Sequence, residues 1–159
     1  MGFFEVPVSA LRRARLVDEL PVEIPVVFEE LSATVLGLPD PLELSVEQRL
    51  GAVQAAARLQ TQVEAYLTQV AGVMDAQGDS RLFAAGTTGS MVAGLSGNNR
   101  AVGSAIVSRA RDLRAMPHVE AAYRQGRITG RHVQVLCRAA GSMPSFGQVE
   151  ADLVAAAAV

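Results

Sequence analysis

The sequence predicts an all-α protein in which a long helix is followed by a helix-turn-helix-like bundle of short helices. Alanine, leucine and arginine dominate the chain, and β-branched or aromatic clusters are sparse apart from valine. This usage favours helix over strand. Half of the 159 residues are apolar, which suits one domain with a core of its own, or a small domain with an arm.

Residues 1–44 are expected to form a proline-interrupted arm, because proline lacks an amide donor and clashes with the preceding helical turn. The prolines are Pro7, Pro21, Pro25, Pro39 and Pro41. Short helices fit between them at 11–20, capped by Ser9, and at 26–36. The stretch 22–28 can instead lie extended against a neighbour. We expect this arm to pack on the main body or on another subunit.

A long helix is predicted at 45–77. Ser45 stands three residues before Gln48, which is the spacing of a capping box, and Gly78 ends the pattern. Steps of three and four predict one buried stripe, formed by Val46, Leu50, Val53, Ala57, Gln60, Val63, Leu67, Val70 and Met74. At about 1.5 Å per residue the helix is longer than a small domain needs. It is either a core helix or, in part, a homodimer seam.

A helix-turn-helix pattern follows. Thr87 or Thr88 can cap a short helix at 89–95, residues 96–99 turn the chain, and a second helix is expected at 99–115. The predicted inward residues are Met91, Val92, Leu95, Val102, Ile106, Ala110 and Leu113. Two helices joined by a short glycine-bearing turn are typical of DNA-binding modules, in which the second helix enters the major groove. Purely structural hairpins share this pattern.

Three further helices complete the prediction. One spans 118–124 and ends at Gly126, and the next is capped by Thr129 and ends near Gly141. In the first of these helices Val119, Ala122 and Tyr123 are expected to face inward, and the second contains Val133, Val135 and Leu136. The last helix is expected at 146–159.

The predicted domain organisation has three parts. After the arm, a helical domain spans 45–141, and its helix-turn-helix-like part occupies 82–141. A C-terminal helix follows at 142–159. The chain stops on a run of alanines and a valine, which is a poor place for a natural domain to end. We therefore expect the sequence to be a truncated piece of a longer protein.

Charge divides the chain into two halves that the net charge of −2 conceals. Residues 81–138 carry nine arginines against two acids, a balance of +7, whereas residues 1–80 carry five arginines against twelve acids, a balance of −7. Such asymmetry predicts an anionic partner for the basic half, or docking between the two halves through acids such as Glu47 and Glu64.

Arginine forks bind phosphates and base edges, so the basic half yields candidate DNA contacts. These candidates are Asn99, Arg100, Arg109, Arg111, Arg114, Arg127 and Arg131. The alternative for the arginines is a solvated face or ion pairs with the acidic half.

The sequence offers no catalytic or metal-binding constellation. Cys137 is the only cysteine, and it stands about 140° around a helix from His132, so the two side chains do not face each other. Cys137 is therefore predicted to be an apolar filler. His118 and His132 lack a nearby acid pair, and the chain contains no lysine for a phosphate-binding loop. We expect no metal and no cofactor.

A connected string of motifs resembles one known family. The string is Gly94-Leu95-Ser96, Ala110-Arg111-Asp112-Leu113, Met116-Pro117, Gly126-Arg127-Ile128-Thr129 and His132-Val133-Gln134-Val135. It resembles the actinobacterial domain of unknown function 222, or 13E12 repeat family, the N-terminal region of HNH-endonuclease proteins. The likeness covers roughly 46–141, although Met91-Val92 stands where the family often has Trp-Leu. The string is also distantly similar to the helix-turn-helix of ParB-type partition proteins.

The resemblance implies a non-catalytic DNA-binding or targeting domain of an HNH-endonuclease-like protein. Nuclease chemistry in the family would reside in a C-terminal module that this sequence does not contain, so we expect no enzyme activity from it. The helix at 99–115 is then the candidate groove reader, with Asn99 and Arg100 near its start. The alternative is a helical oligomerisation or protein-interaction module, with a homodimer through 45–77. We expect a cytoplasmic protein without a membrane span.

Overall fold

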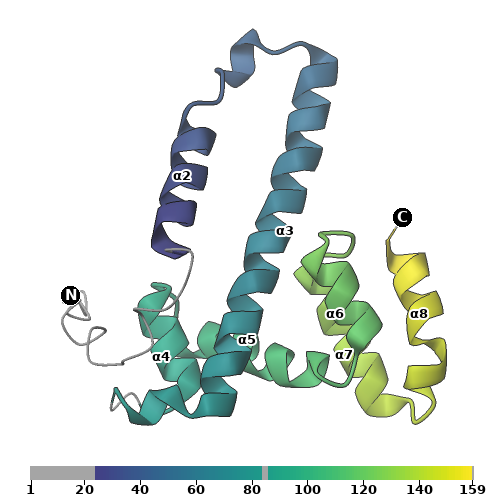
Figure 1. Ribbon diagram of the computed structural model, residues 1–159. Coiled ribbons are helices and arrows are strands. Elements are labelled where there is room, and N and C mark those ends of the chain that lie inside the picture. The colour runs from purple at the N-terminus through teal and green to yellow at the C-terminus, as the bar shows by residue number, and fades with distance from the viewer. Residues whose placement is uncertain (1–23, 84–85, 159) are drawn as a thin grey trace. The chain divides into compact units, whose positions relative to one another are not determined.

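The computed structural model describes residues 24–83 and 86–158, and these are all-α (Figure 1). The described helices are α2 (Ile24–Leu36), α3 (Val46–Gln77), α4 (Thr88–Leu95), α5 (Arg100–Leu113), α6 (Pro117–Arg124), α7 (Gly130–Ser142) and α8 (Phe146–Ala157). Two short 3-10 turns occupy Pro41–Glu43 and Asp79–Arg81. The described residues contain no strand. The predicted fold class, a long helix followed by a bundle of short ones, is confirmed.

The chain divides into two units, Met1–Leu50 and Gly51–Val159, with the division inside α3. In the described part of the first unit, α2 confirms the helix predicted at 26–36. The extended alternative is wrong from Ile24 onward, because Pro25 lies in the first turn, where a missing amide donor costs nothing. The helix predicted at 11–20 lies outside the described residues.

Local capping sets the ends of the helices. The Ser45 amide donates to Gln48 Oε1 at 2.8 Å and the Gln48 amide to Ser45 Oγ at 3.2 Å, so the predicted capping box is present. Thr87, Asn99 and Thr129 likewise accept hydrogen bonds from amides three residues on. At the other end of α3, the chain turns at Gly78, whose φ of +74° favours glycine. The predicted element boundaries hold to within about two residues.

The buried face of α3 differs from the predicted stripe. Its buried residues are Thr61, Ala65, Thr68, Ala71 and Gly72, whereas Val46, Leu50, Val53, Val63 and Val70 are exposed. Small residues form this face because neighbouring elements approach closely: α5 approaches at Gly72, and buried residues of α5 to α8 pack around Ala65. A Cβ placed on Gly72 would stand 3.0 Å from the Ala110 Cβ. Larger side chains at these positions would hold the two helices apart.

The inward faces of α4 and α5 also differ from the predicted ones, because these two helices pack closely together. Ile106, Ala110 and Leu113 are buried as predicted, but Leu95 is 57% exposed and Val102 is 39% exposed. The two helices cross at Gly89 and Gly103, where backbone meets backbone, so Gly103 and Val107 replace Val102 on the inner face. In α7, Val133 and Leu136 are buried, whereas Val135 is exposed.

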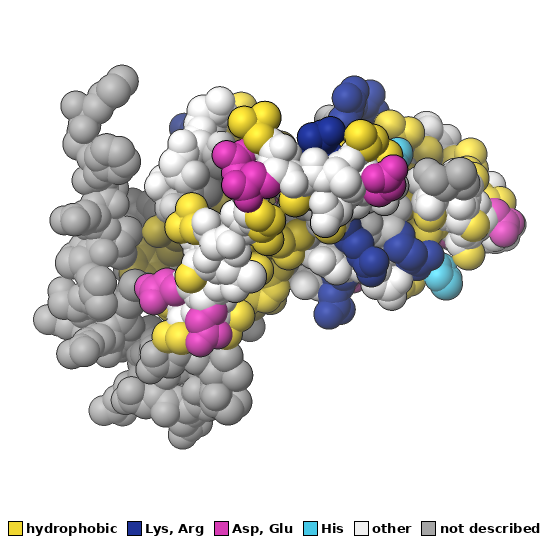
Figure 2. Space-filling model, turned by 90° about the horizontal axis from the view of Figure 1, so that it is seen from above, with side chains coloured by type: hydrophobic (Ala, Val, Ile, Leu, Met, Phe, Trp, Pro, Cys, Tyr) yellow, Lys and Arg dark blue, Asp and Glu magenta, His cyan; other side chains and the backbone are white. Residues whose placement is uncertain are grey.

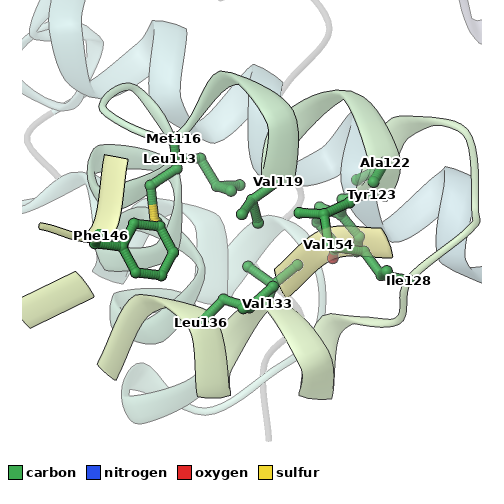
Figure 3. Packing of buried hydrophobic residues seen from close by; sticks show 11 residues of the cluster. Leu113, Met116, Val119, Ala122, Tyr123, Ile128, Val133, Leu136, Phe146 and Val154 are labelled. Carbon is green, nitrogen blue, oxygen red and sulfur yellow. The ribbon is translucent and has the colours of Figure 1, made fainter. Parts of the chain in front are cut away.

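The main core lies among α6, α7 and α8, together with the end of α5 (Figure 3). Its residues include the predicted Val119, Ala122 and Tyr123. Figure 3 shows Val119, Val133 and Leu136 converging from facing helices, with Phe146 beside them. A buried carboxylate completes this core, because Glu150 of α8 accepts a hydrogen bond from the Val119 amide at 2.9 Å. It satisfies an otherwise unpaired donor in the first turn of α6.

Candidate nucleic-acid interface

The turn between α4 and α5 is held by its own side chains. The side-chain nitrogen of Asn98, Nδ2, donates to both the Ser96 carbonyl and the Ser96 Oγ. Gly97 between them adopts a φ of +66°. Asn99 then accepts from the Val102 amide at 3.0 Å and caps α5. These contacts fix the point at which α5 begins.

Three of the candidate arginines hold the C-terminal half of α5 against α3. Arg109 Nη1 donates to Glu64 Oε1 and, at 2.9 Å, to the Tyr123 hydroxyl. Arg111 binds Asp75 through two parallel hydrogen bonds of 2.8 and 2.7 Å. Arg114 Nη2 donates to the Gly72 carbonyl at 2.7 Å. The second helix of the hairpin is therefore anchored at its far end by arginines.

These contacts alter the acid–base properties of the groups involved. The hydrogen bond from Arg111 holds the pKa of Asp75 below its ordinary value, against the opposing effect of burial. Burial lowers the pKa of Arg109, but the hydrogen bonds to Glu64 and Tyr123 outweigh it and the pKa rises. Burial raises the pKa of Tyr123, whose ring also lies 5.9 Å below the Arg109 guanidinium. All of these groups keep their usual charge at neutral pH.

Glu64 connects α5 to α7 as well as to α3. Its carboxylate lies against Gly130, the first residue of α7, where an added Cβ would stand 2.6 and 2.9 Å from the two oxygens. A helix N-terminus favours a negative charge, so the carboxylate is well placed there. Glycine at position 130 leaves room for it. The Glu64 carboxylate therefore lies beside the first residue of α7.

The N-terminal half of α5 is left exposed. Arg100 stands in its first turn and pairs with no acid among the described residues. The exposed positions that follow are Val102 and the small residues Ala101, Ser104, Ala105 and Ser108. Asn99 uses its side-chain oxygen for the cap, and its amide nitrogen bonds to no described residue. The start of α5 therefore has polar side chains that are not used within the described fold, whereas the arginines at its C-terminal end bond to α3.

Arg127 and Arg131 lie at the turn between α6 and α7, where two further arginines join them. Arg58 of α3 donates through Nε to the Gln125 carbonyl at 3.2 Å, and Arg127 donates through Nε to Gln125 Oε1 at 2.8 Å. Arg124 directly precedes Gln125 in the chain. Arg131 lines a shallow hollow of about 320 Å³ together with residues of α3 and α7. We call Arg58, Arg124, Arg127 and Arg131 the turn cluster.

Figure 2 shows arginine side chains gathered on the face seen from above, on which the α6–α7 turn of Figure 1 lies. Sequence reasoning missed two members of the turn cluster. Arg124 was counted in the basic half but not singled out, and Arg58 belongs to the half counted as acidic. No local signal identifies Arg58, because only the packing of α3 against the turn brings it there.

The histidine and the cysteine of α7 take separate roles. His132 Nδ1 accepts from the Thr129 amide at 3.1 Å and completes a capping box. Cys137 packs beside the main core, and burial raises the pKa of its thiol to about 11, so it is protonated at neutral pH. Within residues 24–83 and 86–158, no three His, Cys, Asp or Glu side chains gather as metal ligands would. None of the helices there has the length and apolar character of a bilayer span.

Neither a protein-family model nor a curated protein nor a solved structure matches this chain. The resemblance to domain of unknown function 222 and to the ParB-type helix-turn-helix therefore stays a prediction. Within the described residues, the start of α5 and the turn cluster are the two exposed basic regions that could contact an anionic partner.

Proposed function

We propose that the chain is a non-catalytic DNA-binding or targeting domain of an HNH-endonuclease-like protein, of the domain of unknown function 222 type. One observation carries the proposal. The C-terminal half of α5 is fastened to α3 by Arg109, Arg111 and Arg114, while its N-terminal half is exposed at the end of a short, fixed turn. In helix-turn-helix proteins the N-terminal residues of the second helix contact base edges.

The exposed half of α5 suits a major groove chemically. Arg100 presents a guanidinium fork that can bind guanine, and Asn99 keeps an amide nitrogen available. The small residues that follow, such as Ala101 and Ser104, let the helix backbone approach the bases. Exposed arginines elsewhere, including Arg127 and Arg131, would neutralise phosphates and supply affinity independent of sequence.

A salt-titrated binding assay with duplex DNA tests the proposal. We expect measurable binding of the whole chain at about 50 mM salt, with an affinity that falls steeply as salt rises. Arg100→Gln is expected to weaken binding by about tenfold or more. Arg138→Gln removes an equally exposed arginine from α7 and is the matched control, with a smaller effect. Absence of duplex binding at low salt by the correctly folded chain would refute the proposal.

A second function is favoured by a different observation. Val53, Val63, Val70 and Val73 of α3 are all exposed, and apolar surface of this kind often marks an interface. On this alternative the chain is a helical oligomerisation module that pairs α3 with α3 of a second copy. Sedimentation velocity tests it, with Val63→Glu and Val70→Glu expected to shift a dimer to the monomer. A chain that sediments as a monomer at every concentration would exclude it.

A further inference from the structure

We propose that the turn cluster is a second DNA-contact surface, which binds the phosphate backbone of a duplex separately from the start of α5. The inference rests on the proposed function and assigns to it a specific site. Its residues, Arg58, Arg124, Arg127 and Arg131, come from three elements that meet at the α6–α7 turn.

The turn is held firmly against α3, so the cluster is preorganised. Gly126 adopts a φ of +68°, and a Cβ at this position would stand 2.8 Å from Arg58 Cγ and 3.0 Å from the Arg58 carbonyl oxygen. Glycine at position 126 therefore lets the turn pack directly against α3. Preorganised groups lose less conformational entropy when they bind a ligand.

The hydrogen bonds within the cluster leave its phosphate-binding groups available. Arg58 and Arg127 both bond to Gln125, and both use only Nε. Their terminal Nη groups, which carry four of the five N–H donors of a guanidinium, make no hydrogen bond to a described residue. Gln125 therefore orients the two arginines without consuming their capacity to bind phosphate. In contrast, Arg109 and Arg114 use Nη groups to donate to Glu64 and to the Gly72 carbonyl.

The positive charge of the cluster is not compensated within the described parts of the chain. None of its four arginines lies within ion-pair distance of a described carboxylate. The ion pairs among the described residues join Arg109 to Glu64 and Arg111 to Asp75. The four exposed cations of the cluster come from α3, α6, the α6–α7 turn and α7, and like charges near one another repel. A polyanion would relieve this repulsion. The turn cluster is thus a surface that lacks its counter-charge.

The geometry favours the backbone of a duplex over other anions. The four side chains are exposed around a turn, which suits several separate phosphates better than a single small anion. A small anion at the N-terminus of α7 would be repelled by the Glu64 carboxylate, which lies beside Gly130. Single strands are bound mainly by stacking on aromatic side chains, and the aromatic residue of α6, Tyr123, is 1% exposed.

The absence of lysine from the chain allows a selective test. In the variant Arg124→Lys/Arg127→Lys/Arg131→Lys, the turn cluster carries the only lysine side chains. Acetylation of the folded variant then neutralises these three positions and the N-terminus. Arg58 stays unchanged because its Nε bond helps to hold the turn. The acetylated original chain controls for the N-terminus, and Arg138→Lys, acetylated in the same way, controls for loss of an α7 charge outside the turn.

We expect the triple lysine variant to bind duplex DNA within about threefold of the original chain, because phosphate contacts tolerate either cation. Its acetylation should reduce the slope of log affinity against log salt by about three, roughly 0.9 for each lost phosphate contact. Bound duplex should also protect the three lysines from acetylation, whereas Lys at position 138 should stay reactive. Unchanged circular dichroism verifies the fold in each preparation.

Distinct results would overturn the inference and the proposed function. If acetylation leaves affinity and slope unchanged while Arg100→Gln weakens binding, the turn cluster is not a contact surface, and the proposed function stands. If a single strand binds more tightly than a duplex and protects the lysines equally, the assignment to duplex is wrong. If the original chain binds no DNA at low salt, the proposed function fails and the inference fails with it.

Discussion

Arg109, Arg111 and Arg114 lie in almost the same stretch of sequence as three arginines of the turn cluster, yet the two sets differ in the contacts that they make. Arg109, Arg111 and Arg114 of α5 point toward α3 and bond to Glu64, Asp75 and the Gly72 carbonyl. The turn-cluster arginines are exposed, and no described carboxylate pairs with them. The first set holds the fold together, and the second leaves its charge for a partner.

The difference shows that a charge count does not identify a binding surface. An arginine near a helix can neutralise an acid of the same chain or an anion outside it, and its neighbours decide which. Here Glu64 and Asp75 of α3 pair with Arg109 and Arg111, whereas no described acid lies within ion-pair distance of the turn-cluster arginines. Substitutions that disturb the packing or the arginine contacts of α5 should therefore lower the free energy of unfolding more than substitutions of the exposed arginines.

The N-terminal half of α5 lacks such arginine contacts, so it should depend on close packing against α4. Gly103→Ala places a Cβ 2.1 Å from the Gly89 carbonyl oxygen and 2.8 Å from the Ala93 Cβ. We expect a loss of about 3 kcal/mol in the free energy of unfolding, measured by urea denaturation. Gly94→Ala is the matched control, since its Cβ meets nothing within 4 Å, and should be neutral or slightly stabilising. Equal values for the two variants would contradict the close crossing.

Arg109 is expected to be the most important of the α5 arginines. Arg109→Met leaves Glu64 and the Tyr123 hydroxyl without their donor, and we expect a loss of about 2 kcal/mol. The loss is smaller than for a fully buried pair, because the Glu64 side chain is 41% exposed. A double-mutant cycle with Glu64→Gln measures the coupling. Strictly additive effects would show that the pair does not hold α5 to α3.

Arg111 should reveal its role through pH. At pH 7 we expect Arg111→Gln to lower the free energy of unfolding only slightly, and by less than Arg109→Met, because the Arg111 side chain is largely exposed. The folded-state pKa of Asp75 lies below its unfolded value of about 3.9, so the stabilisation is complete above that pH. It is lost as pH falls through the lower folded pKa. The difference between the variant and the original chain should therefore vanish in acid, and a pH-independent difference would refute the pairing.

Arg124 and Arg131 of the turn cluster should contribute little to stability, because neither makes a side-chain hydrogen bond to a described residue. We expect Arg124→Gln and Arg131→Gln to change the free energy of unfolding by less than about 0.5 kcal/mol each, as is usual for exposed positions away from structural features. Urea denaturation under the conditions used for Arg109→Met gives a direct comparison. A loss as large as that of Arg109→Met would mean that these residues also serve the fold, and it would remove the contrast between the two regions.

Much of the secondary structure was predictable because its signals are local. The boundaries of α3 follow from Ser45, Gln48 and Gly78, and Thr87 caps α4 as the sequence suggests, since a cap involves residues only a few positions apart. The buried face of α3 could not be predicted in the same way. The valines and leucines suggested one stripe, but the helix buries the small residues that α5 can approach most closely.

By itself, then, the sequence determined that the chain is helical and where most of its helices begin and end, through short-range hydrogen bonds and the special backbone of glycine and proline. Only the tertiary structure decided which arginines are used within the fold. Glu64 and Asp75 lie 45 and 36 residues from the arginines that they bind, and Arg58 lies 67 residues from Gln125. Such partners are brought together by helix packing, which the order of charges along the chain does not predict.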